Sequence, residues 1–242
     1  MKKKILRTIF LVFLFLPLLA AAHFFVFPQE TRCILIRFAD LDKQQNIYFR
    51  KGTAVEKISR LQHLRSAAET RVKEFWNNEC PLNYTIIYCN SEAEFNKYGV
   101  AGAPAATQLK LGAYVVLQER SLDPDIIAHE IAHTVLYNTI GWYRTKFKIP
   151  TWFDEGLAMQ VDDRSYYSID TLLEIRKGGL SLPDVTQMEN HGRFFSGDIM
   201  LNFSTAKFTV HEWHRTHLLE TFIEAINNGD SFKEAYNKDA TK

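Results

Sequence analysis

The sequence predicts an α+β fold, in which a small mixed sheet and a long helix precede a helical C-terminal part. Three observations support this prediction. Apolar residues recur at helical spacing between Lys51 and Trp76, and short apolar runs recur between turn residues elsewhere in the first half. In addition, Asp123 and Pro124 together form a strong helix start in the middle of the chain.

Three apolar segments form the predicted sheet. They are Cys33 to Phe38, Tyr84 to Cys89 and Gly112 to Leu117. The helix from Lys51 to Trp76 has an apolar face with charged residues between, so we expect it to pack against this sheet. Ser91, with Glu94 three positions later, has the pattern of a capping box and predicts a short helix after the second strand.

The central helix is predicted to begin at Asp123, because this carboxylate can cap the helix and Pro124 is already set at a helical φ. Gly141 offers a stop, which gives a helix of about four turns. Within it stands the sequence His129-Glu130-Ile131-Ala132-His133. Two imidazoles four positions apart lie on one helix face and can bind one Zn²⁺. Glu130 is not a ligand, so it is free to act as general base on a zinc-activated water.

A catalytic zinc site needs a third protein ligand, and Glu155 is the best candidate. It follows His133 by 155 − 133 = 22 residues. Thr151 as N-cap, with Asp154 as its capping-box partner, predicts that Glu155 lies near the start of another helix. Gly156 is small enough to let this helix approach the first one closely.

These two segments resemble the gluzincin branch of zinc metallopeptidases, specifically the bacterial peptidase MA-like families. In those families H-E-x-x-H is followed by W-x-x-E-G-L-A, which matches His129 to His133 and Trp152 to Ala158. The likeness covers roughly Asn83 to Tyr236, including a helical ending. It implies one Zn²⁺ held by His129, His133 and Glu155, with Glu130 as the catalytic base.

The resemblance also bears on the residues behind the ligands. Thermolysin-like gluzincins often carry Asn directly before the ligand Glu, where it steadies a histidine, so Asp154 could either contact His133 or cap its own helix. Many gluzincins have an acidic residue four positions beyond that Glu, but here Met159 stands there. The group that orients His129 is therefore open between Asp162, Asp163 and a backbone carbonyl.

The function expected from these residues is peptide-bond hydrolysis by a zinc-dependent peptidase. A peptide or protein substrate would pair with an edge strand beside the metal, for which Gly112, Ala113 and Tyr114 are the candidates. One alternative is a non-catalytic module on a peptidase fold that binds a peptide or partner at the membrane surface. Another is a membrane-tethered scaffold whose aromatic C-terminal helices form the working surface.

The N-terminal residues predict where the protein works. Lys2, Lys3, Lys4 and Arg7 precede a nearly uninterrupted apolar stretch from Ile9 to Phe27. Residues 1–28 are therefore expected to be a cleaved signal peptide or an uncleaved membrane anchor, and either places the rest outside the cytoplasm, in the periplasm. Residues 29–242 then form one peptidase domain, with an N-terminal lobe of about 29–140 and a C-terminal lobe of about 141–242.

Composition argues against nucleic acid as a partner and permits one disulfide. Lys and Arg number 29 against 28 Asp and Glu, and a net charge of +1 provides no electrostatic attraction for nucleic acid. An extracytoplasmic location permits one disulfide, either Cys33 with Cys89 or Cys80 with Cys89.

Overall fold

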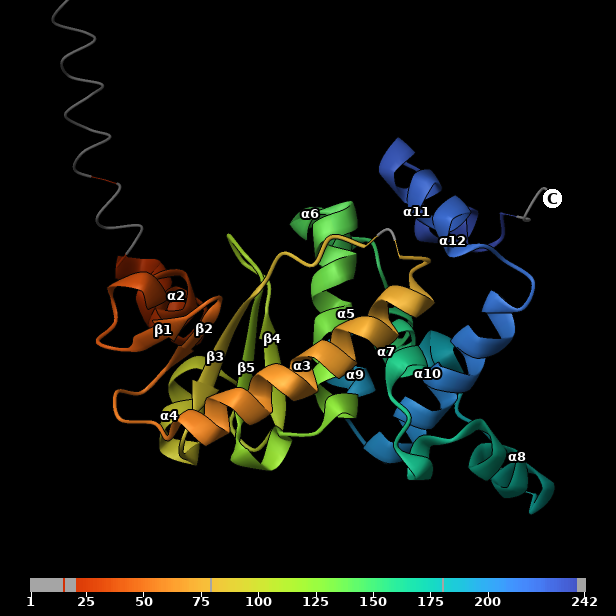
Figure 1. The fold of residues 1–242 in the computed structure, drawn as a ribbon. Coiled ribbons are helices and arrows are strands. Elements are labelled where there is room, and N and C mark those ends of the chain that lie inside the picture. Colours follow the sequence, from red (N-terminus) through yellow and green to blue (C-terminus); the bar gives the residue numbers. More distant parts are fainter. Residues whose placement is uncertain (1–14, 16–20, 79, 180, 239–242) are drawn as a thin grey trace, which may run out of the picture.

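A computed structural model describes residue 15 and residues 21–78, 80–179 and 181–238 of the chain. In these residues a five-stranded mixed sheet is combined with many helices, which confirms the predicted mixture of helix and small sheet (Figure 1). Most of the predicted signal or anchor, residues 1–28, lies outside the described residues. Within the described part of the chain, no helix has both the length and the apolar character needed to cross a bilayer.

The sheet has the strand order β1-β2-β3-β5-β4. Its strands are β1 (Asp42–Gln44), β2 (Ile47–Phe49), β3 (Thr85–Cys89), β4 (Ala105–Gln108) and β5 (Tyr114–Gln118). The three inner strands run parallel to one another, and the two outer strands run antiparallel to their neighbours. The register pairs Ile87 of β3 with Val116 of β5.

Alternate residues of the inner strands face opposite layers of helices. Ile86 and Tyr88 belong to the core that includes α3 (Val55–Phe75) and α5 (Pro124–Ile140). Ile87 and Cys89 face the other way, where α2 (Pro28–Ile34) and α4 (Glu92–Tyr98) cover the sheet. Such alternation follows from the period of two residues along a strand, and it buries the sheet on both faces.

The long helix predicted between Lys51 and Trp76 is confirmed as α3, which begins at Val55. Its buried face consists of residues at helical spacing, namely Ile58, Leu61, Ala68 and Val72. The short helix predicted after the second strand is also present. The Ser91 hydroxyl caps α4 by accepting a hydrogen bond from the Glu94 amide.

The predicted strand from Cys33 to Phe38 is wrong, because this segment contains the end of α2 and a short 3-10 helix, η1 (Ile36–Phe38). Pro28 stands at the first position of α2 and favours a helix from there onwards. The buried side chains are Cys33 and Ile36, three residues apart, as a helix face requires. A short apolar run of this kind is ambiguous between strand and helix.

The position assigned to Gly112, Ala113 and Tyr114 at a sheet edge is also wrong. Tyr114 begins β5, which is hydrogen-bonded to β3 on one side and to β4 on the other. Both sides of the strand are therefore occupied, and no peptide can be added there. The edge next to α5 is β4, a strand that the sequence did not predict.

Helix α5 forms as predicted. The Asp123 carboxylate accepts a hydrogen bond from the Asp125 amide, and Pro124 is the first residue of the helix. Gly141 ends it with a φ of 82°, a conformation that glycine adopts without strain. The helix is buried along most of its length, since it lies between the sheet, α3 and the helices that follow.

The C-terminal part is helical. Its elements are α6 (Trp142–Phe147), α7 (Thr151–Ala158), η3 (Met159–Val161), η4 (Ser165–Tyr167), α8 (Ile169–Lys177), η5 (Val185–Met188), α9 (His191–Phe194), α10 (Ile199–His214), α11 (Leu219–Asn228) and α12 (Phe232–Tyr236). A further 3-10 helix, η2 (Glu119–Ser121), lies before α5.

Gly156 makes a close helix contact, but the partner is α10 and not the metal-binding helix. A Cβ at Gly156 would lie 2.5 Å from Val210 and 2.7 Å from the Ala206 carbonyl oxygen.

All three cysteines are free thiols in this structure, so neither proposed disulfide is formed. Cys33 and Cys89 are buried in the same small core on the α2 and α4 side of the sheet. Burial raises the pKa of both thiols, that of Cys89 to about 12. Cys80 is only partly buried and packs against the main core.

Candidate metal centre

Two imidazoles of α5 face each other as the helix spacing predicts. Nε2 of His129 and Nε2 of His133 lie 3.2 Å apart, and the two rings are nearly perpendicular, with centroids 4.9 Å apart. Both side chains are buried. One turn of a buried helix thus brings two nitrogen donors to the same point.

Glu155 of α7 supplies a carboxylate at that point. Its Oε2 atom lies 3.3 Å from Nε2 of His129 and 3.5 Å from Nε2 of His133. Oε2 is buried and has no hydrogen-bond partner. Burial acts to raise the pKa of Glu155, but the neighbouring histidines outweigh it and hold the pKa well below its ordinary value.

The spacing of these three atoms fits a tetrahedral metal ion. Zinc lies about 2.0–2.1 Å from its nitrogen and oxygen ligands, so two tetrahedral ligands are separated by about 3.3 Å. The observed separations of 3.2, 3.3 and 3.5 Å agree with that value. Among the described residues, His129, His133 and Glu155 form a group that could hold a metal ion. The buried, unpartnered Oε2 of Glu155 supports the same conclusion, because an orphaned buried carboxylate oxygen is costly without a cation.

Asp154 contacts His133 and does not cap its own helix. Its Oδ1 atom lies 2.8 Å from Nδ1 of His133. The residue before α7 is Pro150, and no side chain caps that helix end. Because a carboxylate accepts hydrogen bonds, this contact holds the His133 proton on Nδ1 and leaves a lone pair on Nε2, the nitrogen that faces the metal position.

The charges around His133 affect its own protonation. Burial acts to lower the pKa of His133, but the carboxylates of Asp154 and Glu155 outweigh it and raise the pKa well above its ordinary value. A metal ion therefore competes with a proton for Nε2, as is general for histidine ligands.

Asp162 is the acidic residue that faces His129. It is fully buried, and its Oδ2 atom lies 3.9 Å from Nδ1 of His129. Asp163, the other acidic candidate, is exposed and pairs with Arg71 instead. Of the two acidic candidates for orienting His129, Asp162 therefore has the appropriate position, although the distance exceeds a direct hydrogen bond.

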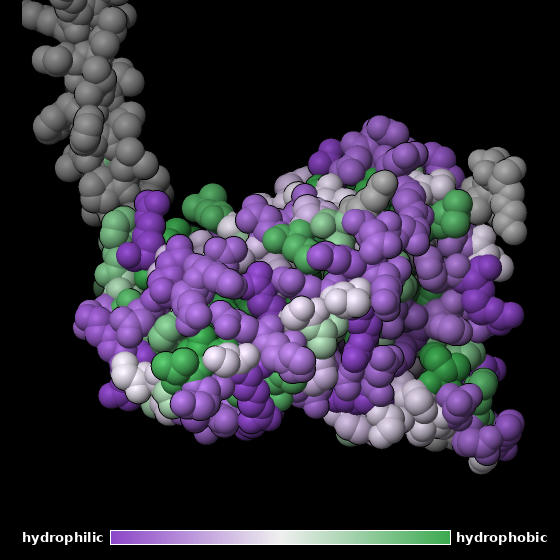
Figure 2. Space-filling model, in the orientation of Figure 1, coloured by the Kyte–Doolittle hydropathy of each residue, from purple (hydrophilic) through white to green (hydrophobic). Residues whose placement is uncertain are grey.

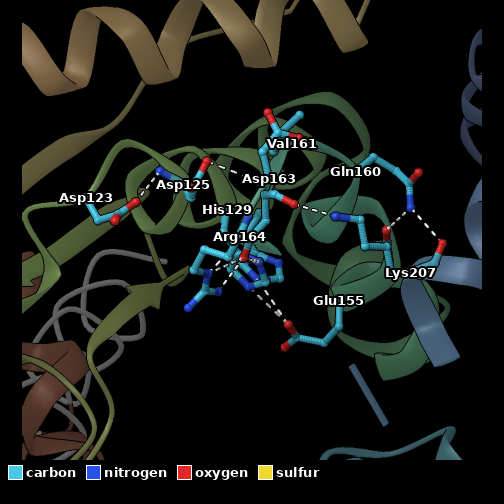
Figure 3. A network of polar contacts seen from close by, with 12 residues as sticks. Asp123, Asp125, His129, Glu155, Gln160, Val161, Asp163, Arg164 and Lys207 are labelled. Carbon is cyan, nitrogen blue, oxygen red and sulfur yellow. Dashed lines mark hydrogen bonds and ion pairs between the residues drawn. The ribbon is translucent and has the colours of Figure 1, made fainter. Parts of the chain in front are cut away.

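Arg164 and Lys207, which are labelled in Figure 3, hold Asp162 in place. The Arg164 guanidinium donates from Nε to both carboxylate oxygens, at 2.9 and 3.0 Å. Burial acts to raise the pKa of Asp162, but Arg164 outweighs it and keeps the pKa below its ordinary value. The Lys207 amine, on α10, donates to the main-chain carbonyl of Asp162. Asp162 is thus a charged, oriented group behind the metal position.

Glu130 points to the edge strand. Its carboxylate oxygen Oε2 lies 2.5 Å from the hydroxyl of Thr107 on β4, and the same hydroxyl lies 3.1 Å from the Glu130 carbonyl oxygen. Glu130 is only partly buried, unlike the two histidines beside it. The candidate base is therefore tied to the edge strand of the sheet, and it remains open to solvent.

Thr107 was not foreseen from the sequence. The segment Ala105–Gln108 has neither β-branched enrichment nor a regular alternation of apolar and polar residues, so it gives no strand signal. Its strand conformation depends on pairing with β5. The aromatic residue Phe203, whose ring centroid lies 6.0 Å from that of His129, was likewise not identified, because only the packing of α10 brings it there.

The chain was compared with known protein families and with curated proteins. It matches no family, and it has no significant sequence similarity to any of the curated proteins.

Proposed function

We propose that this protein is a zinc-dependent peptidase of the gluzincin type, in which His129, His133 and Glu155 bind the metal and Glu130 is the general base. One observation carries the proposal. Three donor atoms lie at the edge lengths of a tetrahedral zinc site, and a partly exposed carboxylate that is not in that ligand set stands between the two histidines on the helix. A purely structural zinc site would normally have a fourth protein ligand and no need for such a carboxylate.

The metal ion, when bound, would polarise a substrate carbonyl and lower the pKa of water towards about 7. The chain's own residues provide the remaining functions. Glu130 accepts a proton from the attacking water and passes it to the leaving amine. The Thr107 hydroxyl, 2.5 Å from that carboxylate, orients it. Asp154 fixes the tautomer of His133, and Asp162 faces the outer nitrogen of His129.

The substrate would bind as an extended peptide along β4. This strand pairs with β5 on one side, and in the described sheet its other side is free of strand partners. Main-chain hydrogen bonds to a free strand edge hold a peptide independently of most of its side chains. In this proposal the sheet belongs to an N-terminal lobe, the helices after Gly141 form a C-terminal lobe, and the scissile bond lies between them.

The proposed location is based on the N-terminal sequence. The basic cluster and the apolar stretch from Ile9 to Phe27 support an extracytoplasmic protein, with the segment acting as an export signal or as an anchor. In this proposal the substrate is a peptide or protein outside the cytoplasm.

Hydrolysis of casein or of a fluorogenic peptide mixture by the purified full chain tests the catalytic proposal. We expect activity that a chelator removes and zinc restores. Glu130→Gln should retain zinc and lose hydrolysis, whereas Glu212→Gln, which changes an exposed carboxylate on α10, should behave as the unmodified protein. A Glu130→Gln variant that cleaves at the original rate would falsify the assignment of the base. A zinc-loaded protein without any hydrolysis would favour the non-catalytic binding module.

Elemental analysis tests the ligand set separately. Glu155→Ala should lower zinc retention after dialysis, because a three-ligand site loses its only oxygen donor. Glu174→Ala, an exposed carboxylate on α8, is the matched control and should keep full occupancy. Full zinc occupancy in Glu155→Ala would remove this residue from the ligand set.

A further inference from the structure

Exposed apolar side chains occur on three elements along one side of the molecule. Leu111, at the tip of the loop between β4 and β5, is 83% exposed. Helix α6 exposes Trp142, Tyr143 and Phe147, and the residues just before α2 expose an apolar run from Phe24 to Phe27. We define these three groups as the apolar rim.

The three parts of the apolar rim are connected by specific contacts. The Lys110 amine pairs with Glu30 of α2 at 2.8 Å and lies 3.8 Å from the centre of the Phe27 ring. On the other side of the same loop, the Gly112 amide donates to the Tyr137 hydroxyl of α5 at 3.3 Å. Tyr137 is in the last turn of α5, directly before α6. The loop tip therefore lies between α2 and α6.

The pictures agree with these contacts. In Figure 1, α2, the free end of the β4–β5 hairpin and α6 all lie along the upper side of the molecule. Figure 2, in the same orientation, shows separate hydrophobic patches along this side, with hydrophilic surface between them. The three groups of the rim therefore lie on the same side of the molecule.

The composition of the rim fits a lipid surface. Trp142 and Tyr143 are the aromatic types that concentrate at membrane interfaces, and they are joined by Phe147, whose ring centroid lies 5.5 Å from that of Trp142. Leu111 has a φ of 51°, which is uncommon for a residue without a short polar side chain. Its side chain lies almost entirely outside the protein core. Water is a poor environment for such a side chain, whereas the acyl region of a bilayer is a good one.

The charge of the rim supports the same partner. The segments that carry or adjoin the rim, 28–38, 108–113 and 141–148, contain Glu30 as their only carboxylate side chain. Against it stand six basic residues: Arg32, Arg37, Lys110, Arg144, Lys146 and Lys148. The whole chain has a net charge of only +1, so positive charge is concentrated here. Each basic residue near a bilayer with anionic headgroups raises the binding constant for that bilayer by about fivefold.

We infer that the apolar rim is a membrane-contact surface, with Leu111, Trp142, Tyr143 and Phe147 inserted among the headgroups of an anionic bilayer. The apolar stretch from Ile9 to Phe27 joins the fold at this rim, so an anchor formed by it would bring the same side to the lipid. Where the proposed function holds, the metal site lies close to the bilayer. His133 precedes Gly141 by 141 − 133 = 8 residues of α5, about 12 Å along a helix. Substrates would then be cleaved near the membrane surface.

Site-specific labels on the full chain test this inference without measuring activity. An environment-sensitive fluorophore is attached at Leu111→Cys or Phe147→Cys, in a Cys80→Ser background because the other two thiols are buried. Val55→Cys is the matched control. Val55 is 71% exposed, and it lies near Lys57, which pairs with Glu119 beyond the opposite end of β5. The proteins are reconstituted into phosphatidylcholine vesicles with and without phosphatidylglycerol.

Nitroxide-labelled lipids should quench the labels at 111 and 147 several-fold more than the label at 55, and iodide in the water should show the opposite order. Lys146→Glu should reduce lipid quenching at 147 several-fold in vesicles with phosphatidylglycerol. If tethering by the N-terminal segment were the only contact, positions 111 and 147 would respond as position 55 does, which overturns the inference. Shielding of both positions from iodide without any lipid quenching would also overturn it and point to a protein partner.

Discussion

His133 donates a 2.8 Å hydrogen bond from Nδ1 to Oδ1 of Asp154, although the two residues lie on different helices and 21 positions apart. Asp154 directly precedes the candidate ligand Glu155. Consecutive residues of α7 thus contact the same histidine from two sides, one at each ring nitrogen. This arrangement sets the tautomer of His133 and the approach of α7 to α5 at the same time.

Asp154 should therefore contribute to metal affinity. Asp154→Asn preserves the size of the side chain but removes the charge that holds the proton on Nδ1. Loss of such a partner typically lowers metal affinity by about 10-fold to 100-fold. Competition for zinc against a chromogenic chelator measures the change. Asp163→Asn, which alters an exposed carboxylate paired with Arg71, should leave affinity unchanged. Equal affinities for the two variants would show that Asp154 does not support the site.

The Thr107 hydroxyl should matter for turnover and not for metal binding. Thr107→Val keeps the shape of the side chain and removes the donor to the Glu130 carboxylate. Loss of a hydrogen bond to a charged group costs about 2 kcal/mol, so we expect kcat to fall by at least about tenfold while zinc content stays constant. Thr107→Ser restores the hydroxyl and should recover most of kcat. If Thr107→Val instead loses zinc, the contact is structural, and if its kcat is unchanged, the contact has no role in the reaction.

Features of the site that depend only on neighbouring residues in the sequence could be predicted. Features that depend on tertiary pairing could not. The spacing of His129 and His133 follows from helix geometry alone, and the start of α5 follows from Asp123 and Pro124. By contrast, β4 becomes a strand only through its pairing with β5, so Thr107 was not identified.

Two other outcomes show the same limit. Asp162 and Asp163 are adjacent acidic residues and equivalent in the sequence, and only the packing of η3 and α10 buries the first and exposes the second. The short apolar run that ends at Phe38 is compatible with either a strand or a helix. The packing of Cys33 and Ile36 against the sheet favours the helix.

The three thiols should react at very different rates. Cys33 and Cys89 are buried, and burial raises the pKa of both, which leaves almost no reactive thiolate at neutral pH. Cys80 is partly exposed and should react first with an aromatic disulfide reagent. We expect one fast thiol in the folded protein and three after unfolding, with the fast phase absent in Cys80→Ser. A count of one thiol after unfolding without reductant would instead reveal a disulfide.

The close approach of α7 to α10 at Gly156 should make this position intolerant of any side chain. A methyl group there would lie 2.5 Å from Cγ2 of Val210 and 2.7 Å from the Ala206 carbonyl oxygen, and the backbone oxygen cannot move without shifting α10. Overpacking of this kind costs about 1–3 kcal/mol, so Gly156→Ala should lower the free energy of unfolding by that amount in urea denaturation. Gly192→Ala is the control, because its nearest neighbour would be 3.7 Å away and the residue lies in helix α9, so it should leave stability unchanged or raise it by up to about 1 kcal/mol. Since α7 also carries Asp154 and Glu155, a shift of this helix should weaken zinc binding in Gly156→Ala and not in Gly192→Ala. Equal stability and equal zinc affinity in both variants would mean that α7 is not positioned by its contact with α10.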